Sequence, residues 1–198
     1  MKLISFSGLD GSGKTTQVKL FVNYLKKKNR PYKVVHMIRN SIGNRLLNGL
    51  GETEKKKNKS RTKACSWGVL FRKLALIVDL VVFRFYLFFA GKRDLVIVCD
   101  RYFYDYLVNI FYLEDKKGAY IAPVLKSLIP KPDLALFLKI SPKQADKRKK
   151  DQGLDYLDAK QKLYKKFGRR FGFKTIHSRE KKTDTAKLIE KQWEKIKG

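Results

Sequence analysis

The stretch Gly8-Leu9-Asp10-Gly11-Ser12-Gly13-Lys14-Thr15-Thr16 matches the pattern G-x-x-x-x-G-K-S/T of a loop that binds nucleotide phosphates. The residues before it, Lys2–Ser7, are mostly apolar and rich in strand formers. The residues after it, Gln17–Lys28, carry apolar side chains at helical spacing. Strand, glycine loop and helix are the context that this motif requires, so the sequence predicts a nucleotide-binding P-loop.

The residue types of this loop suit phosphate binding. Gly8, Gly11 and Gly13 permit backbone angles at which successive amides point inward, and the N-terminus of the next helix adds partial positive charge there. Lys14 is long enough to reach the β- and γ-phosphates, and the Thr15 hydroxyl is a ligand for Mg²⁺. The alternative is an ordinary glycine-rich turn, which the flanking pattern disfavours.

Composition predicts one folded domain. With 198 residues, 43% hydrophobic and 13% aromatic, the chain is long enough for one substantial core and too apolar for disorder, so we expect a single domain over residues 1–198. Cys65 and Cys99 lie far apart in apolar surroundings, as buried thiols of a reducing compartment do. The short N-terminal apolar run leads straight into the glycine loop, so we expect no signal peptide and a cytoplasmic protein.

The net charge of +28 is the most unusual feature of the composition. Such a charge favours nucleic acid or an anionic membrane as partner. The alternative is a lysine-rich protein whose charges are spread over solvated helix faces and which handles phosphorylated substrates. Because the sequence has no nucleic-acid motif, we favour the alternative, and we place an anionic membrane surface ahead of nucleic acid as a partner.

Strand-like runs alternate with helical stretches along the rest of the chain. Strands are expected at Tyr32–Ile38, Asp94–Asp100, Leu134–Ile140 and Phe173–His177. Helices are expected at Phe103–Leu113, Tyr120–Leu128, from Ser141 to a break near Gln152, at Tyr156–Phe171 and at Thr183–Lys197. Together with the first strand, this order predicts an α/β fold of about five parallel strands with helices on both faces, the three-layer architecture of P-loop NTPases.

Residues 64–90 form an exceptionally apolar segment. Its charges are Arg72, Lys73, Asp79 and Arg84, which argue against a membrane-spanning helix. We expect one long helix or two in sequence, with an extra apolar face that packs on another subunit or lies in a membrane interface. A homodimer through this segment is our first choice. The lysine-dense run Glu52–Lys63 before it is expected to be a loop.

Asp100-Arg101-Tyr102 closes the third predicted strand with charged side chains. A carboxylate at that tip can orient Mg²⁺ through its waters, and the adjacent arginine can bind phosphate with two donors. A helix cap beside an exposed arginine is the structural alternative.

The end of the second predicted strand is also a candidate ligand site. Arg39 and Arg45 follow it at the edge where open α/β sheets bind ligands, and we favour a substrate role for Arg39. His36 and His177 lie in strand-like runs without neighbours at metal-ligand spacing, and we expect both to be structural.

With these stretches established, the chain resembles the thymidylate kinase family of nucleoside-monophosphate kinases. The matching segments are Phe6–Thr16, Asp100-Arg101-Tyr102, Pro132-Asp133-Leu134 and the Ala145…Arg148…Leu154-Asp155 region, in the family's order. The resemblance implies transfer of the ATP γ-phosphate to dTMP with Mg²⁺, a phosphorylated small molecule as substrate, and a homodimer.

The resemblance also assigns roles to residues. It implies that Lys14 and Thr15 hold ATP phosphates and Mg²⁺, that Asp10 contacts the acceptor's sugar hydroxyl, and that Arg101 clamps the acceptor phosphate. Gly11 stands where some members carry a loop arginine, so the resemblance implies a basic lid over about residues 141–155, with Arg148, Lys149 and Lys150 as its cations. The expected catalytic residues are Lys14, Arg101, Asp100, Asp10 and Arg148.

The acceptor side departs from the family pattern. Asp105 replaces an expected serine, and Ile110 stands where a side chain that reads thymine is expected, with Asn109 as a substitute donor. Arg72 and Arg84 are both candidates for the base-facing arginine, and Tyr102 is counted with the substrate-binding residues.

These departures leave three functions to separate. The first is phosphoryl transfer to a nucleoside monophosphate, dTMP by resemblance. The second is the same kinase with a hydroxyl acceptor on a nucleoside, sugar or lipid-linked glycan, with Asp105, Asp10 or Asp100 as base. The third is a nucleotide-gated scaffold without small-molecule transfer, which we favour least.

Overall fold

A computed structural model describes residues 1–37, 66–91, 94–114, 123–148, 153–178 and 181–197. Its strands are β1 (Lys2–Gly8), β2 (Tyr32–Val35), β3 (Val96–Asp100), β4 (Leu134–Lys139) and β5 (Lys174–His177). They form one five-stranded sheet in the order β2-β3-β1-β4-β5, and every neighbouring pair is parallel. The predicted parallel α/β sheet is therefore confirmed.

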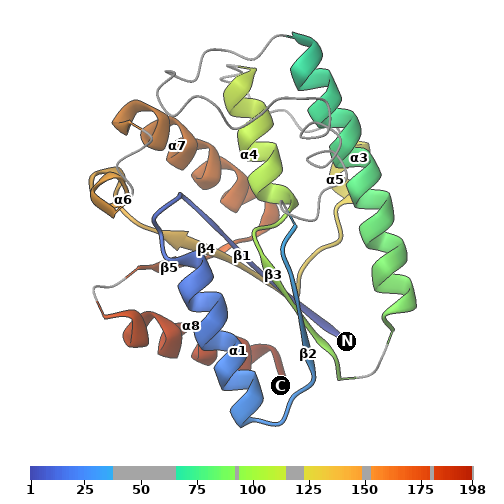
Figure 1. The fold of residues 1–198 in the computed structure, drawn as a ribbon, viewed down its shortest axis with the longest axis vertical. Helices are drawn as coiled ribbons and strands as arrows, with labels where there is room; N and C mark the ends of the chain where they lie inside the picture. The colour runs from blue at the N-terminus through green and yellow to red at the C-terminus, as the bar shows by residue number, and fades with distance from the viewer. Residues whose placement is uncertain (38–65, 92–93, 115–122, 149–152, 179–180, 198) are drawn as a thin grey trace, which may run out of the picture.

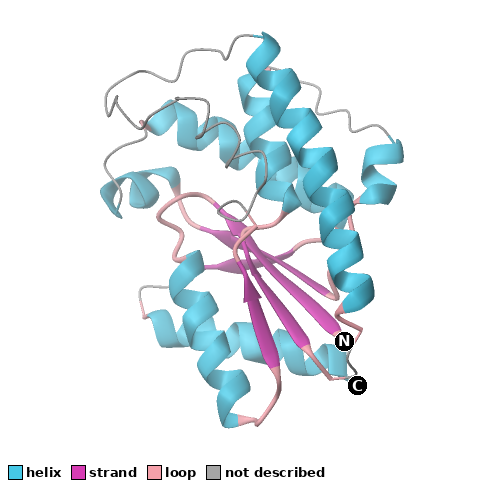
Figure 2. Ribbon diagram, turned by 45° about the vertical axis from the view of Figure 1, so that its right-hand side comes forward, coloured by secondary structure: helices cyan, strands magenta, loops and turns pink. Residues whose placement is uncertain are grey.

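Helices cover both faces of this sheet (Figures 1 and 2). They are α1 (Lys14–Lys27), α3 (Ser66–Phe89), α4 (Phe103–Leu113), α5 (Pro123–Leu128), α6 (Pro142–Arg148), α7 (Leu154–Phe171) and α8 (Lys182–Lys197). Helices α1 and α8 pack on one face, where Phe21 meets Trp193 with ring centroids 5.4 Å apart. Helices α3, α4 and α7 bury their apolar side chains against the other face. The three-layer prediction is confirmed.

The register of the central strands decides where the site lies. β1 pairs with β3 so that Phe6 lies opposite Asp100, and it pairs with β4 so that Gly8 lies opposite Leu138. The apolar residues of β1 and β3 are buried on both faces, as expected for central parallel strands. This pairing brings the glycine loop and the Asp100-Arg101 step to the same edge of the sheet.

Several boundaries differ from the sequence-based prediction. Helix α1 begins at Lys14 rather than Gln17, so the motif's lysine and threonines form its first turn. Strand β2 ends at Val35 and β4 at Lys139, each shorter than the predicted run. The predicted helix Tyr120–Leu128 is described as α5 from Pro123 onward. Some predicted features lie outside the described residues, namely the loop at 52–63 and Arg39, Arg45, Cys65, Lys149 and Lys150. Cys99 is described, and it is a buried free thiol.

The apolar segment forms a single helix, α3, of 24 residues. Its inner side buries Leu76, Leu80 and Phe83 against the core. Its outer side exposes large apolar side chains, from Leu70 near the start to Phe88 and Phe89, which are each 79% exposed, at the end. Within the described ranges, no helix combines the length and hydrophobicity needed to cross a membrane.

The two sides of α3 predict different effects of a phenylalanine-to-alanine substitution on the free energy of unfolding. We expect Phe83→Ala to destabilise the protein by about 3–5 kcal/mol, because Phe83 fills a site that is 5% exposed and its removal leaves a cavity. Phe89→Ala, at a side chain that is 79% exposed, is the matched control, and its effect on unfolding in urea should stay within about 0.5 kcal/mol. Equal losses for the two variants would contradict this assignment of the helix faces.

Candidate active site

The glycine loop is held in a conformation that side chains would disrupt. Gly8 has φ +151°, and a Cβ there would lie 2.6 Å from the Leu138 carbonyl oxygen. Gly11 has φ +82°, and a Cβ there would lie 2.8 Å from the Ala145 carbonyl oxygen. Glycine is therefore required at both positions for the loop to pack against β4 and α6.

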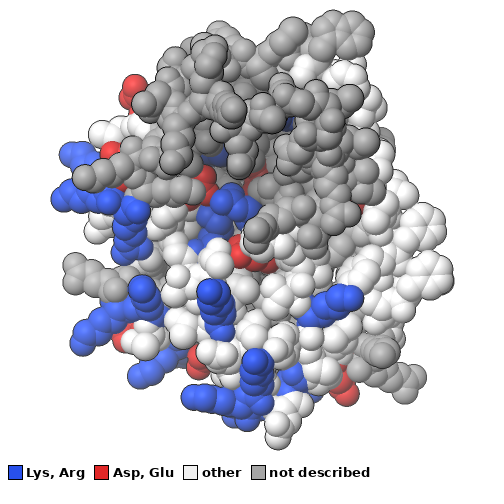
Figure 3. Space-filling model, in the orientation of Figure 1, with Lys and Arg blue, Asp and Glu red and all other residues white. Residues whose placement is uncertain are grey.

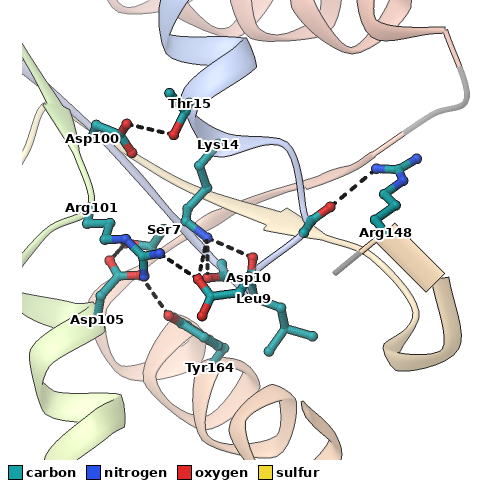
Figure 4. A network of polar contacts seen from close by, with 12 residues as sticks. Ser7, Leu9, Asp10, Lys14, Thr15, Asp100, Arg101, Asp105, Arg148 and Tyr164 are labelled. Atoms are coloured by element: carbon teal, nitrogen blue, oxygen red, sulfur yellow. Dashed lines mark hydrogen bonds and ion pairs between the residues drawn. The ribbon is translucent and has the colours of Figure 1, made fainter. Parts of the chain in front are cut away.

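The loop holds the Lys14 ammonium among its own carbonyl groups (Figure 4). Nζ donates to the carbonyl oxygens of Gly8 at 2.8 Å and Leu9 at 2.7 Å, and it lies 3.9 Å from Asp10 Oδ1. Lys14 is only 5% exposed. Burial, followed by the nearby Arg101 guanidinium, lowers the pKa of Lys14 to about 8, although Asp105, Asp10 and Asp100 oppose the shift.

Arg101 meets the same loop from the neighbouring strand. Its Nη2 atom donates to Asp10 Oδ1 at 2.5 Å, and its backbone has φ +66°, a left-handed conformation that is uncommon for arginine. Residues at unfavourable backbone angles persist where the surrounding structure holds them, and they cluster at functional sites. Asp10 therefore lies between two cations, one from the first turn of α1 and one that directly follows β3.

Asp100 and Thr15 form the oxygen-rich part of the site. Thr15 Oγ1 donates to Asp100 Oδ2 at 2.9 Å, and the carboxylate is only 2% exposed. Asp100 Oδ1 is buried without a hydrogen-bond partner among the described residues. Mg²⁺ prefers one or two carboxylates, water and substrate phosphates to a cage made only of protein groups. The donor set therefore fits Mg²⁺, and the described residues hold no cluster of three or more His, Cys, Asp or Glu side chains that would suit another metal.

One cavity of about 410 Å³ joins the glycine loop, Lys14, Thr15 and Arg101. It is lined by Asp10, Gly11, Gly13, Lys14, Thr15, Thr16, Gln17, Arg101, Arg148, Ser178 and Lys182. Arg148 reaches it from the end of α6, where Nη1 donates to the Gly11 carbonyl oxygen at 3.4 Å. The cavity is strongly basic, and its size and lining suit phosphate groups.

Comparison with known proteins fits this geometry. The family model described as Thymidylate kinase matches residues 6–196. This chain belongs to the thymidylate kinase family.

Three curated proteins named Thymidylate kinase are similar to the chain. The protein from Desulfotalea psychrophila is 30% identical over 70% of this chain and 63% of its own length. The protein from Rickettsia canadensis is 27% identical over 74% of this chain and 68% of its own length. A short match of 29 residues to the protein from Fervidobacterium nodosum is 62% identical and covers 15% of each chain. The chain thus spans less than two thirds of the first relative.

Asp105, where the thymidylate kinase family pattern predicts a serine, lies behind the cavity. It is 1% exposed, and Oδ2 accepts hydrogen bonds from Ser7 Oγ at 2.7 Å and the Tyr102 backbone amide at 2.9 Å. Oδ1 accepts from the Tyr164 hydroxyl at 2.7 Å. Through these contacts Asp105 ties β1, α4 and α7 together, and its charge favours the cationic forms of Lys14 and Arg101.

Other residues predicted on the acceptor side are also placed differently. Tyr102 is fully buried, and its hydroxyl donates to the Pro130 carbonyl oxygen at 2.6 Å. Arg72 donates to the Gly68 carbonyl of its own helix at 3.2 Å. Arg84 donates to the carbonyls of Leu128 and Ser127 at the end of α5, which occupies the guanidinium away from the cavity.

The cavity also includes residues that the sequence did not single out. Ser178 and Lys182 follow the end of β5, and Gln17 Nε2 donates to the Lys182 carbonyl oxygen at 3.0 Å. Their position after a strand at the ligand edge of the sheet was the available signal. His36, predicted to be structural, lies against Asp100 with Nε2 3.1 Å from Oδ2.

The lowered pKa of Lys14 predicts pH-dependent nucleotide binding. The ammonium form binds phosphate, and its fraction falls from about nine tenths at pH 7 to about one tenth at pH 9 when the pKa is about 8. We therefore expect ADP affinity, measured by calorimetry, to weaken about tenfold between these pH values. Lys14→Met should bind ADP more weakly and with a flat profile; an equal slope in both proteins would assign the pH dependence to another group.

Proposed function

We propose that this protein transfers the γ-phosphate of ATP to a nucleoside monophosphate, and that the acceptor is dTMP. The observation that carries the proposal is that Lys14, in the first turn of α1, and Arg101, directly after β3, line one cavity and both contact Asp10 Oδ1. One cation is positioned for the donor phosphates, and the other for an acceptor phosphate. The name shared by the curated relatives supports dTMP as the acceptor.

Within this proposal, the donor phosphates bind the amides of the glycine loop and the N-terminus of α1. Lys14 then exchanges its bonds to the Gly8 and Leu9 carbonyls for phosphate oxygens. Thr15 and Asp100 would hold Mg²⁺, which neutralises charge on the transferring phosphates when it is bound. Arg148, which already touches the loop at Gly11, adds positive charge on the α6 side.

The acceptor needs alignment rather than deprotonation. A phosphate monoester has a second pKa of ~6 and is largely dianionic at neutral pH, so it requires no general base. Arg101 binds this phosphate while Asp10 holds the guanidinium in place and remains near the acceptor sugar. The cations offset the repulsion between two anions that must meet in line.

The geometry disfavours a hydroxyl acceptor. Such an acceptor needs a carboxylate base within hydrogen-bond reach. Asp105 has both oxygens occupied by protein donors, and Asp100 faces Thr15 and His36 at the proposed metal site. The third candidate base, Asp10, lines the described cavity, but its Oδ1 atom already accepts a hydrogen bond from Arg101.

We also propose that the protein is located in the cytoplasm, where both proposed substrates are found. We further propose that it forms a homodimer through α3. Exposed apolar residues of α3 recur at alternating steps of three and four: Phe71, Leu74, Val78, Val81, Phe85 and Phe88. This heptad spacing is typical of a seam that packs against a second helix. Figure 3 shows Lys and Arg side chains mainly over the left and lower parts of the visible face, with other residues between them.

An assay of acceptors tests the function. We expect dTMP to be phosphorylated with Mg²⁺-ATP, and Lys14→Ala to abolish turnover. Arg101→Lys should lower kcat/KM for the acceptor about 10- to 100-fold with little change in the KM for ATP, because a two-pronged charged contact is lost. Arg84→Lys is the matched control outside the cavity. Thin-layer separation of labelled products identifies the acceptor, and transfer to a nucleoside or sugar hydroxyl instead of dTMP would refute the proposal.

Light scattering after size-exclusion chromatography tests the dimer. We expect a dimer at tens of micromolar protein and a monomer for Phe85→Glu, since a buried carboxylate without a partner costs several kcal/mol. Lys187→Glu on α8 is the control and should remain dimeric. A monomeric wild-type protein that sediments with vesicles containing phosphatidylserine would replace the dimer with the membrane interpretation.

A further inference from the structure

His36 lies beside Asp100 because of strand register. β2 pairs with β3 so that Val35 lies opposite Cys99. The next residue of each chain segment, His36 and Asp100, therefore meets the other at the carboxyl edge of the sheet. The imidazole Nε2 lies 3.1 Å from Asp100 Oδ2. A carboxylate oxygen only accepts hydrogen bonds, so Nε2 carries the proton in this contact.

The two oxygens of the Asp100 carboxylate have different contacts. Oδ2 accepts a hydrogen bond from Thr15 Oγ1 and lies 3.1 Å from His36 Nε2, whereas Oδ1 is buried without a hydrogen-bond partner among the described residues. These two contacts on one oxygen restrict the rotation of the carboxylate. They also direct the Thr15 hydroxyl hydrogen toward Asp100, which leaves the lone pairs of Oγ1 available to a cation.

We propose that His36 is a positioning residue for the metal-binding part of the site. Its contact with Oδ2 restricts the Asp100 carboxylate to one orientation, in which Asp100 and Thr15 would hold Mg²⁺. Partners of this kind set ligand orientation at metal sites in general, and their loss lowers metal affinity about 10- to 100-fold. The inference rests on the proposed use of Mg²⁺-nucleotide, but not on the identity of the acceptor.

The test measures binding of ADP by calorimetry with and without Mg²⁺, in the absence of any acceptor. We expect Mg²⁺ to strengthen ADP binding to the wild-type protein and His36→Leu to reduce that enhancement about tenfold, with metal-free ADP affinity unchanged within about twofold. His36→Gln should retain the enhancement, because its amide nitrogen can donate from the position of Nε2. His177→Leu, at the end of the opposite edge strand, is the matched control.

A second comparison distinguishes positioning through Asp100 from a general packing role. In an Asp100→Asn background, adding His36→Leu should cause no further loss of the Mg²⁺ enhancement, since both changes disable the same chain of contacts. A full enhancement in His36→Leu, a loss in His36→Gln as large as in His36→Leu, or additive losses in the double variant would overturn the inference. Failure of dTMP phosphorylation would refute the proposed function and leave this binding result standing.

Discussion

The buried ammonium of Lys14 is the constraint on which the site depends. A cation that is only 5% exposed must be compensated whether or not a nucleotide is bound. The Gly8 and Leu9 carbonyls supply direct bonds, while Asp10, Asp100 and Asp105 supply negative charge nearby. Asp10 also holds Arg101, so the two cations of the site share one anion. The acidic residues of the site therefore keep its cations in place when no ligand is bound.

Asp105 connects the negative charge near Lys14 to the packing of the surrounding helices and strands. Its oxygens collect hydrogen bonds from Ser7 on β1, the first turn of α4 and Tyr164 on α7. A carboxylate can accept all of these bonds at once, whereas a serine in its place would offer one donor and two acceptor lone pairs. The departure from the family pattern at this position thus links the charge balance of the site to the packing of three elements.

Much of this architecture could be predicted from local sequence. The glycine loop, the buried run that ends at Asp100 and the alternation of strands with helices were sufficient for a parallel α/β sheet and for a site near Lys14 and Arg101. The direction of a side chain was harder to predict. Tyr102 and Asp105 lie one and four residues after Arg101 in sequence, but the turn into α4 directs both into the core. The contact of His36 with Asp100 depends on the pairing of two strands that are distant in sequence, and spacing along the chain does not show it.

The left-handed backbone at Arg101 restricts how this protein can evolve. Glycine or asparagine adopts that conformation most readily, and β-branched residues are strongly disfavoured there. A lineage that abandoned phosphate chemistry would relieve the backbone by a single exchange to one of those two residues. Valine or isoleucine would add steric conflict to the loss of charge. The residue found at this position in a divergent descendant therefore records whether selection on the anion site has persisted.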